Sequence, residues 1–212
     1  MFHDHTILIA LGVTADGKKH PLALREGATE NATVAKALRK AIRDVFGPLG
    51  VVQRCQDHKQ RNVLDHLPEN VRPRVRRVLR AAREMNDAAI AEPRLRALAG
   101  SPEHDHPGAV SSLLEGLVET LTLQRLGIRG ALYRTLRSTN AIENLNGGIG
   151  RFTRNVKNWQ GGAMLLRWVG AGIVRASVGF RRVRGHADIP KLNAALDRTI
   201  KHNTLDRQQK AA

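Results

Sequence analysis

The chain is poor in cysteine, in aromatic residues and in acidic residues, and it has no long apolar run. One cysteine among 212 residues excludes an internal disulfide and fits a reducing compartment. Four Phe, two Trp and one Tyr are too few for a single-strand binder that stacks bases on aromatic platforms. No apolar run approaches the roughly 20 residues of a membrane span, and no signal peptide opens the chain, so we expect a cytoplasmic protein without a membrane partner.

The shortage of acids leaves a large positive charge. The 35 Lys and Arg residues against 19 Asp and Glu give a net charge of +16, which predicts a polyanionic partner, most commonly nucleic acid. Between Glu119 and Asp188 the single acidic residue is Glu143. The same window holds twelve cations, namely Arg125, Arg129, Arg134, Arg137, Arg151, Arg154, Lys157, Arg167, Arg175, Arg181, Arg182 and Arg184.

Glu143 lies where the pattern predicts the start of a helix. Residues 138–140 all belong to types that cap helices, and the spacing from Asn140 to Glu143 is that of a capping box. The apolar positions Ile142, Leu145 and Ile149 form the expected buried stripe. Two interpretations stay open at this point: Glu143 only closes the capping box, or it binds a cation while the surrounding bases hold a polyanion.

The N-terminal quarter alternates strand and helix signals. Residues 6–13 (TILIALGV) and 20–25, joined by a turn at 15–18, predict a β-hairpin with a fully buried first strand. Thr29 or Asn31 is expected to cap a helix that ends at Phe46, before Gly47 and Pro48. Residues 51–53 are a short strand candidate.

The remainder is helical in pattern. From residue 62 to about residue 130 we expect helices, with loops at Pro93 and at residues 100–108. One apolar stripe comprises Val71, Val75, Val78 and Leu79, and a second comprises Leu113, Leu114, Leu117, Leu121 and Leu123. A helix is expected over residues 162–180, and the tail after Asp188 predicts a short helix.

Two smaller features have competing interpretations. The loop 151–162 mixes cations with amides, one indole and paired glycines, which favours phosphate contact over a merely solvated loop. Cys55 and His58 form a C-x-x-H pair, but one cysteine cannot complete a standard structural zinc site. We therefore expect a buried thiol and a hydrogen-bonded imidazole there.

Three blocks, residues 10–31, 53–63 and 136–146, together resemble the catalytic region of Mutator-type insertion-sequence transposases. The resemblance implies an α/β fold with an incomplete RNase H-like core, interrupted by a helical insertion, and mostly helical overall. It places the partial core at residues 1–62, the insertion at 63–132, a catalytic helix with a basic DNA-facing region at 133–187, and a tail at 188–212.

The resemblance also implies a chemistry. Such enzymes perform DNA transposition by DDE chemistry, in which three carboxylates hold two Mg²⁺ or Mn²⁺ ions for strand cleavage and transfer at transposon ends. Glu143 matches the third acid, a catalytic residue and metal ligand, and Cys55 and His58 match a motif near the active site. The implied residues at the double-stranded DNA are Arg137, Asn140, Asn146, Arg151 and Arg154, to which the basic loop adds Lys157. Partners would be DNA and a full-length transposase or a second copy, in a nucleoid-associated setting.

The departures from the family pattern decide the expected activity. The family's first aspartate precedes the strand that opens here, and its second is absent where the helix after residue 31 runs directly into a later one, as if a deletion had joined them near residues 35–38. Asp4, Asp44 and Asp57 are nearby, but none stands where the pattern requires. We expect a truncated, internally deleted and catalytically inactive chain, either a transposase remnant that binds DNA without enzymatic activity or a product that scarcely folds.

Overall fold

The computed structural model describes residues 6–27, 32–47, 50–100, 106–159 and 161–211. Two compact units divide the chain: unit 1 comprises Met1–Gly50 with Asn140–Ile189, and unit 2 comprises Val51–Thr139 with Pro190–Ala212. Helices predominate, and the described residues contain one sheet of two strands. The mostly helical character expected from the sequence is confirmed, whereas the RNase H-like core and the four domain boundaries stay predictions.

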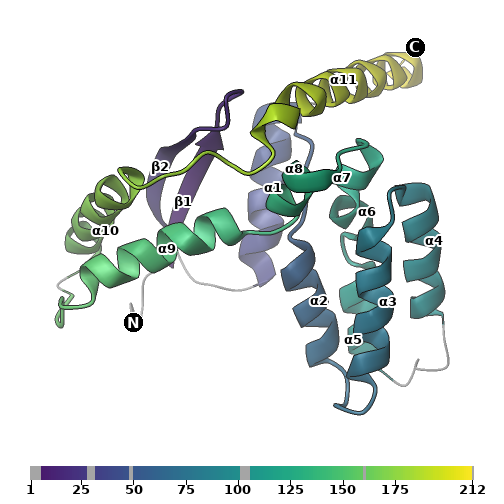
Figure 1. Ribbon diagram of the computed structural model, residues 1–212, viewed down its shortest axis with the longest axis horizontal. Coiled ribbons are helices and arrows are strands. Elements are labelled where there is room, and N and C mark those ends of the chain that lie inside the picture. The colour runs from purple at the N-terminus through teal and green to yellow at the C-terminus, as the bar shows by residue number, and fades with distance from the viewer. Residues whose placement is uncertain (1–5, 28–31, 48–49, 101–105, 160, 212) are drawn as a thin grey trace. The chain divides into compact units, whose positions relative to one another are not determined.

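Among the described residues, unit 1 contains both strands and three α-helices, whereas the regular elements of unit 2 are all helices (Figure 1). Unit 1 contains β1 (Thr6–Val13), β2 (Lys19–Gly27), α1 (Ala32–Phe46), α9 (Asn140–Thr153) and α10 (Gly162–Ser177). Unit 2 contains α2 (Gln56–Asp65), α3 (Arg72–Glu84), α4 (Ala88–Ala99), α5 (Pro107–Leu114), α6 (Leu117–Thr120), α7 (Thr122–Arg125), α8 (Gly130–Leu136) and nearly all of α11 (Ile189–Ala211). A short 3₁₀ turn, His186–Asp188, precedes α11.

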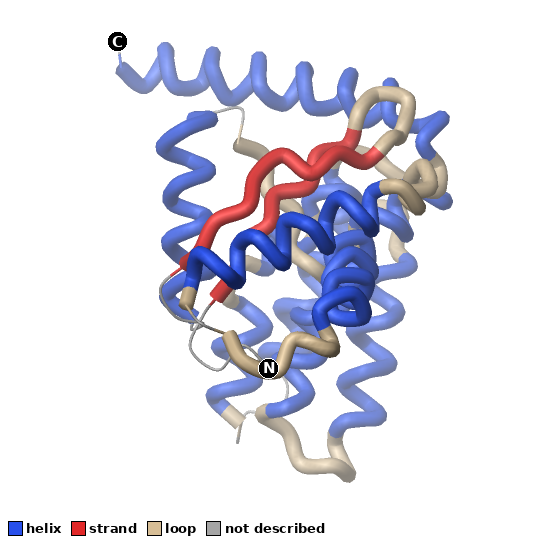
Figure 2. The backbone as a smooth tube through the Cα atoms, turned by 90° about the vertical axis from the view of Figure 1, so that its left-hand side faces the viewer, coloured by secondary structure: helices blue, strands red, loops and turns tan. Residues whose placement is uncertain are grey.

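The predicted hairpin is present. Strands β1 and β2 pair antiparallel along their whole length, as Figure 2 shows in red. The register shifts between Ala10, which pairs with Ala23, and Leu11, which pairs with Pro21, so Leu22 is left as the extra residue of a β-bulge. Leu22 lies over Gly12, where an added Cβ would come within 2.8 Å of its Cδ1.

The expectation that the first strand is fully buried is wrong. Val13, at the end of the strand, is 42% exposed. Leu8 is 41% exposed, while Ile7, Ile9 and Leu11 on the other face pack against the helices of unit 1. The alternation arises because residues of a strand point to opposite faces, and α9 and α10 cover one face of the hairpin. A continuous apolar run predicts burial on both faces, which requires more layers than the described residues of this unit provide.

The core of unit 1 forms where α9 and α10 meet the hairpin. Its fully buried side chains are Leu145, Ile149, Leu165, Val169 and Ile173, with strand residues such as Leu24 packed against them. Two glycines permit the close approach of the helices. A Cβ at Gly148 would lie 3.3 Å from Ala176 Cβ, and one at Gly172 would lie 3.3 Å from Ile149 Cγ2. The predicted apolar stripe of α9 is therefore confirmed at Leu145 and Ile149.

The hairpin turn is fastened to the segment that follows α10. The Thr14 hydroxyl donates to Asp16 at 2.5 Å, and Lys18 and Arg182 form ion pairs with the same carboxylate at 3.1 and 3.6 Å. The Thr14 hydrogen bond and then Lys18 hold the pKa of Asp16 well below its usual range. Gly17 takes a φ of +82°, and its carbonyl accepts a hydrogen bond from Val183 N at 2.9 Å.

The core of unit 2 is built from the stripes of its helices. Val75 and Leu79 of α3 face Ala91 and Leu95 of α4, and Leu113, Leu117 and Leu121 continue the same cluster. Leu114, predicted inside the stripe, is 41% exposed because α5 ends there and Glu115 turns into extended backbone. Val63 and Leu64 bring α2 into this core. The helices of unit 2 therefore share one apolar core.

Three local expectations are wrong. Residues 51–53 are extended but form no strand, because no other strand of the described residues pairs with them. Pro93 lies inside α4, where the burial of Ala91 and Leu95 carries the helix through a residue without an N–H. The tail forms a long helix, α11, instead of a short one. The helix expected to end at Phe46 is confirmed as α1, although its cap at Thr29 or Asn31 lies outside the described residues.

Replacement of Gly17 by alanine is expected to destabilise unit 1 by more than about 1–2 kcal/mol, which is the cost of the left-handed backbone alone for a residue with a Cβ. The added Cβ would stand 2.3 Å from His186 Cβ, so the turn must also separate from the segment after α10. Hydrogen exchange of the β1 and β2 amides measures the effect. Gly47→Ala is the matched control in the same unit, because Gly47 has a φ of +51° and a Cβ added there would meet no atom within 4 Å. Equal effects of the two substitutions would show that the contact with His186 contributes nothing.

Candidate nucleic-acid interface

Helix α9 presents its polar residues on one exposed face. Its apolar residues Leu145 and Ile149 are buried at 2% and 4% exposure, so the periodicity turns Glu143 and Asn146 toward solvent. The helix begins at Asn140, so the residue in the cap position is Thr139 and not Asn140 as the capping-box interpretation requires. Glu143 therefore lies one position further into the helix than that interpretation places it.

Glycines make the same face of α9 unusually open. A Cβ at Gly150 would meet no atom within 4 Å, and one at Gly147 would meet only the Arg151 guanidinium at 3.9 Å. Glycine inside a helix costs roughly 0.5–1 kcal/mol relative to alanine. Packing requires the small residue at Gly148, but it does not require one at Gly147 or Gly150. These two positions expose helix backbone that a ligand could approach closely.

The predicted loop 151–162 begins later than expected, because α9 continues to Thr153 and Arg151 lies in its last turn. Arg151 of α9 and Arg154 and Lys157 of the loop that follows are exposed, and no carboxylate of the described residues forms an ion pair with any of them. The Trp159 indole packs against the core of unit 1 and thus anchors the loop. The adjacent Phe152 ring contacts Trp168 with centroids 6.0 Å apart. The loop is therefore held by its aromatic residues and presents its cations outward.

The C-x-x-H pair belongs to unit 2, where it begins helix α2. The Cys55 Sγ accepts from the backbone N–H of His58 at 3.4 Å and so caps the helix. The Thr139 hydroxyl lies 3.6 Å from Cys55 Sγ and 3.2 Å from His58 Nδ1. The thiol is half-buried, and its contacts are those of a cap and a hydrogen-bonded imidazole.

Arg137 contacts residues of unit 2, close to the Cys55 and His58 pair. Its carbonyl accepts a hydrogen bond from Gln56 N at 2.8 Å. Its guanidinium forms an ion pair with Glu84 at 3.4 Å and lies over the Tyr133 ring at 5.6 Å. Of the residues predicted at the DNA, Asn140, Asn146, Arg151, Arg154 and Lys157 thus share unit 1 with Glu143. Arg137 accompanies Cys55 and His58 in unit 2.

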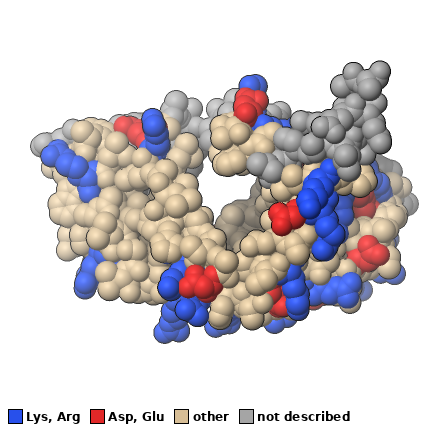
Figure 3. All heavy atoms as spheres, turned by 90° about the horizontal axis from the view of Figure 1, so that it is seen from above, with Lys and Arg blue, Asp and Glu red and all other residues tan. Residues whose placement is uncertain are grey.

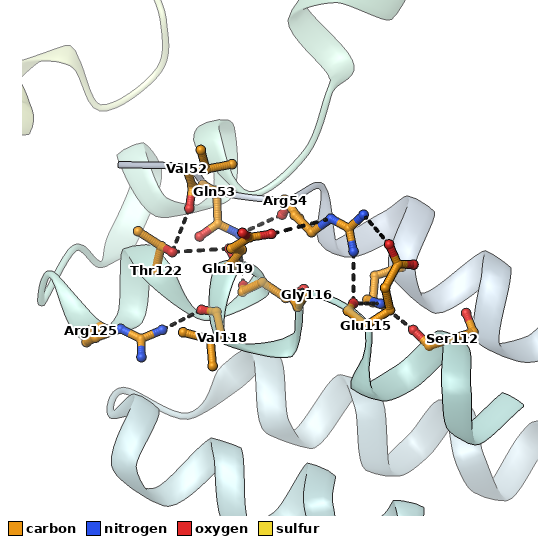
Figure 4. A network of polar contacts seen from close by, with 12 residues as sticks. Val52, Gln53, Arg54, Ser112, Glu115, Gly116, Val118, Glu119, Thr122 and Arg125 are labelled. Carbon is orange, nitrogen blue, oxygen red and sulfur yellow. Dashed lines mark hydrogen bonds and ion pairs between the residues drawn. The ribbon is translucent and has the colours of Figure 1, made fainter. Parts of the chain in front are cut away.

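A polar network joins residues 52–54 to the helices of the insertion (Figure 4). Gln53 Nε2 donates to Thr120 O at 2.8 Å, and Gln53 Oε1 accepts from Leu123 N at 2.9 Å. Thr122 Oγ1 donates to Val52 O at 2.7 Å. Arg54 donates to Glu115 O at 2.8 Å, beside Gly116, where a Cβ would clash with its guanidinium. Of the segment's own backbone groups, Val52 O thus accepts from a side chain and Arg54 N donates to Glu119 O at 3.0 Å, while the Gln53 side chain satisfies backbone groups of the neighbouring helices.

Sequence reasoning missed the buried amide centre behind this network. Gln56, at 2% exposure, donates to Thr120 O at 3.0 Å and accepts from the Tyr133 hydroxyl at 3.1 Å. Gln124 donates to Ala82 O and Met85 O. Neutral amides leave no charge pattern, so the available signal was two glutamines on otherwise apolar helical faces.

Charge on the surface is not confined to one place. On the face drawn in Figure 3, Lys and Arg project at many separate positions, with Asp and Glu among them. In unit 2 the carboxylates of Asp57, Glu84 and Glu92 are paired with arginines. None of the described helices is both long enough and apolar enough to cross a membrane.

The described carboxylates of unit 1 and of unit 2, each unit taken by itself, do not form a two-metal centre. Within the described residues no three His, Cys, Asp or Glu side chains lie close enough together to hold a metal ion. Of the aspartates that could substitute for the family's first two, Asp44 pairs with Lys40 at 2.5 Å on α1, and Asp57 pairs with Arg83 at 2.6 Å in unit 2. Asp4 lies outside the described residues. Two dications need several carboxylates for charge balance, so the described chain supplies no step through Mg²⁺ or Mn²⁺.

Comparison with known proteins gives the family. The family model described as "Transposase, Mutator family" matches residues 34–181. The transposase for insertion sequence element IS6120 of Mycolicibacterium smegmatis is 29% identical over 160 residues, covering 65% of this chain and 49% of the relative. The transposase for insertion sequence element ISRM5 of Rhizobium meliloti is 29% identical over 188 residues, covering 78% of this chain and 46% of the relative.

The chain belongs to the Mutator family of transposases. The resemblance seen in the three sequence blocks is thereby confirmed at the level of the family. The chain spans about half the length of the two curated relatives, so the activity of the whole protein does not transfer to it directly.

Tyr133, the single tyrosine of the chain, provides a probe of the buried amide centre. Burial raises the pKa of its phenol above the ordinary value of about 10. Above that pH the unfolded chain loses the proton while the folded chain keeps it, so the free energy of unfolding is expected to fall as pH rises through the folded pKa. Ultraviolet absorbance of the phenolate, recorded for the native chain and in urea, measures both pKa values.

Tyr133→Phe is the control for this titration. The variant lacks the hydrogen bonds to Arg83 O and Gln56 Oε1, so it is expected to be about 1 kcal/mol less stable near neutral pH. Above about pH 10 its free energy of unfolding should fall less steeply with pH than that of the wild type. If the pKa of the phenol in the native chain is equal to or lower than its pKa in urea, the burial of Tyr133 is contradicted.

Proposed function

We propose that this chain serves DNA transposition as a segment of a Mutator-type transposase that binds double-stranded DNA, including transposon ends, through unit 1. The binding surface is the open face of α9 together with the basic segment 151–184. The observation that carries the proposal is the set of exposed cations Arg151, Arg154 and Lys157, which have no carboxylate partner among the described residues. Asn140 and Asn146 would fix register on the same backbone, since neutral amides also contact phosphates.

The family's inherited chemistry is metal-dependent strand cleavage and transfer, in which Glu143 would be the surviving metal ligand. Among the described residues no three potential metal ligands lie together, so the proposal assigns no cleavage to the chain by itself. Its setting would be the bacterial nucleoid, where its substrate lies.

A second candidate is a non-enzymatic role as a competitor or partner of a full-length transposase. The observation that favours it is that Asp44 and Asp57 already have cationic partners, so neither is available to complete a metal site. In this role the chain occupies transposon ends, or joins an assembly whose other subunit supplies the carboxylates. Addition of the chain to a strand-transfer assay of a full-length relative separates the two: a competitor lowers strand transfer, whereas a contributing partner raises it.

DNA binding is expected to weaken steeply with salt and to be indifferent to Mg²⁺. Removal of one phosphate-binding cation should reduce the slope of log K against log salt by about 0.9. Fluorescence anisotropy with a duplex carrying the transposon end measures affinity between roughly 50 and 200 mM salt, the range over which electrostatic binding to phosphates dominates. Arg151→Gln with Arg154→Gln should flatten the slope. Arg198→Gln with Lys201→Gln, which removes equal charge from exposed positions on α11, should change it less.

A nicking assay with the same protein tests whether the chain cleaves DNA. Wild type and Glu143→Gln are incubated with transposon-end DNA in Mn²⁺, and neither is expected to nick it. Nicking that the wild type performs and Glu143→Gln abolishes would overturn this part of the proposal. Equal salt slopes for the two neutralised pairs would overturn the assignment of the surface to unit 1.

The glycines of α9 supply a test that separates stability from binding. Gly147→Ala and Gly150→Ala should each stabilise the helix by roughly 0.5–1 kcal/mol, because a Cβ meets open space there. Both should weaken DNA binding, because the Cβ keeps a phosphate backbone from the helix. Gly148→Ala is the control, since its Cβ would press on Ala176 and lower stability instead. Stabilised variants with unchanged DNA affinity would show that no ligand approaches this face.

A further inference from the structure

Helix α3 of unit 2 carries an arginine face that its own unit does not use. Its buried residues Val75, Leu79 and Ala82 lie along one side of the helix. At about 100° per residue, Arg76, Arg80 and Arg77 stand about 100°, 140° and 200° around the helix from Val75. All three are exposed, so their stems turn away from the buried stripe.

The charges of this face have no partner inside the described structure. No ion pair or hydrogen bond of the side chains of Arg76, Arg77 or Arg80 is present in the residues that the structure describes. The carboxylates nearest in sequence are already engaged, since Glu84 pairs with Arg137 and Asp57 pairs with Arg83. On the neighbouring α4 the arrangement differs, because Arg96 pairs with Glu92 one turn away at 2.7 Å.

The arrangement is unfavourable for an isolated helix. Arg76 and Arg80 are four residues apart and Arg77 and Arg80 are three apart, and each such like-charged pair costs roughly 0.2–0.5 kcal/mol. A bound polyanion would relieve this repulsion, which a merely solvated face would not.

We infer that Arg76, Arg77 and Arg80 form a second nucleic-acid surface, on unit 2, that contacts the phosphate backbone of DNA. The inference rests on the proposed function, because it assigns a further contact for the same ligand. Arg76 and Arg80 lie about 6 Å apart along the helix axis, so they can meet different phosphates of a backbone that repeats about every 3.4 Å per strand. The planar guanidinium also binds phosphate in a bidentate manner.

Two other partners fit the face less well. An anionic membrane surface requires an apolar side that enters the lipid, but the apolar side of α3 is buried in the core of unit 2. An acidic protein partner requires a central apolar or aromatic anchor, and α3, all of whose residues the structure describes, exposes no large hydrophobic side chain. The duplex backbone needs neither.

The test uses the full chain, duplex DNA carrying the transposon end, and the triple variant Arg76→Gln, Arg77→Gln and Arg80→Gln. Glutamine and arginine have similar helix propensity, so α3 should remain folded, which circular dichroism checks. The variant is expected to bind several-fold more weakly than wild type at low salt, with a salt slope less steep by up to about 2.7. The corresponding lysine triple should keep the slope, because the charge is retained.

Controls separate the failure of this inference from the failure of the proposed function. A wild-type chain that does not bind duplex DNA overturns both. If wild type binds and Arg151→Gln with Arg154→Gln weakens binding, while the α3 triple changes affinity no more than Arg198→Gln with Lys201→Gln, the inference fails and the proposed function stands. Co-sedimentation with vesicles containing phosphatidylserine is run alongside. An α3-dependent association with vesicles in the absence of α3-dependent DNA binding would also overturn the inference.

Discussion

The architecture of unit 2 depends on how an extended segment without a β partner satisfies its hydrogen bonds. Residues 51–55 are half-buried, and an unpaired buried peptide group costs about as much as a missing hydrogen bond. Within this segment Val52 O accepts from Thr122 Oγ1, and Arg54 N donates to Glu119 O. Gln53 meets the end of α6 through Thr120 and the start of α7 through Leu123, and Gln56 continues the contact one turn into α2. Helices from two distant stretches of the chain are thereby fixed by neutral amides at the point where the C-x-x-H pair begins.

Some cations of the chain are paired with carboxylates and others are not. In unit 2 several arginines pair with carboxylates, as in Asp57 with Arg83 and Glu84 with Arg137. Other cations have no ion pair among the described residues, and they include Arg151, Arg154 and Lys157 in unit 1 and Arg76, Arg77 and Arg80 on α3. Such like charge repels itself and opposes the compact state. Both units carry this excess, so the charge imbalance is a property of the surface and not of one loop.

Much of the local structure could be predicted from the sequence, and the errors have a common cause. The β-branched run before Asp16 and Gly17 defines the hairpin, and the spacing of Leu145 and Ile149 defines which side of α9 is buried. The burial of β1 and the strand at residues 51–53 were predicted wrongly, because each depends on a neighbouring strand that local pattern cannot reveal. Pro93 was predicted wrongly because tertiary burial outweighed a local preference.

Part of the candidate site could also be predicted from the sequence. The exposed polar side of α9 followed from helical periodicity, so Glu143 and Asn146 were placed together correctly on one helix. The assignment of Arg137 to unit 2 depends on its contacts with Gln56 and Glu84, which are far away in sequence. The buried glutamines were not predicted, because a neutral amide has the same local signature inside a protein as on its surface.

The contact of Gln56 N with Arg137 O, with Thr139 beside Cys55, brings together the two ends of a stretch more than eighty residues long. A stretch whose entrance and exit meet can be accommodated within a host chain much as a short loop would be, since the entropy of closing it is met by its own contacts. The chain that enters this stretch and the chain that leaves it are thus held together by hydrogen bonds within unit 2 itself.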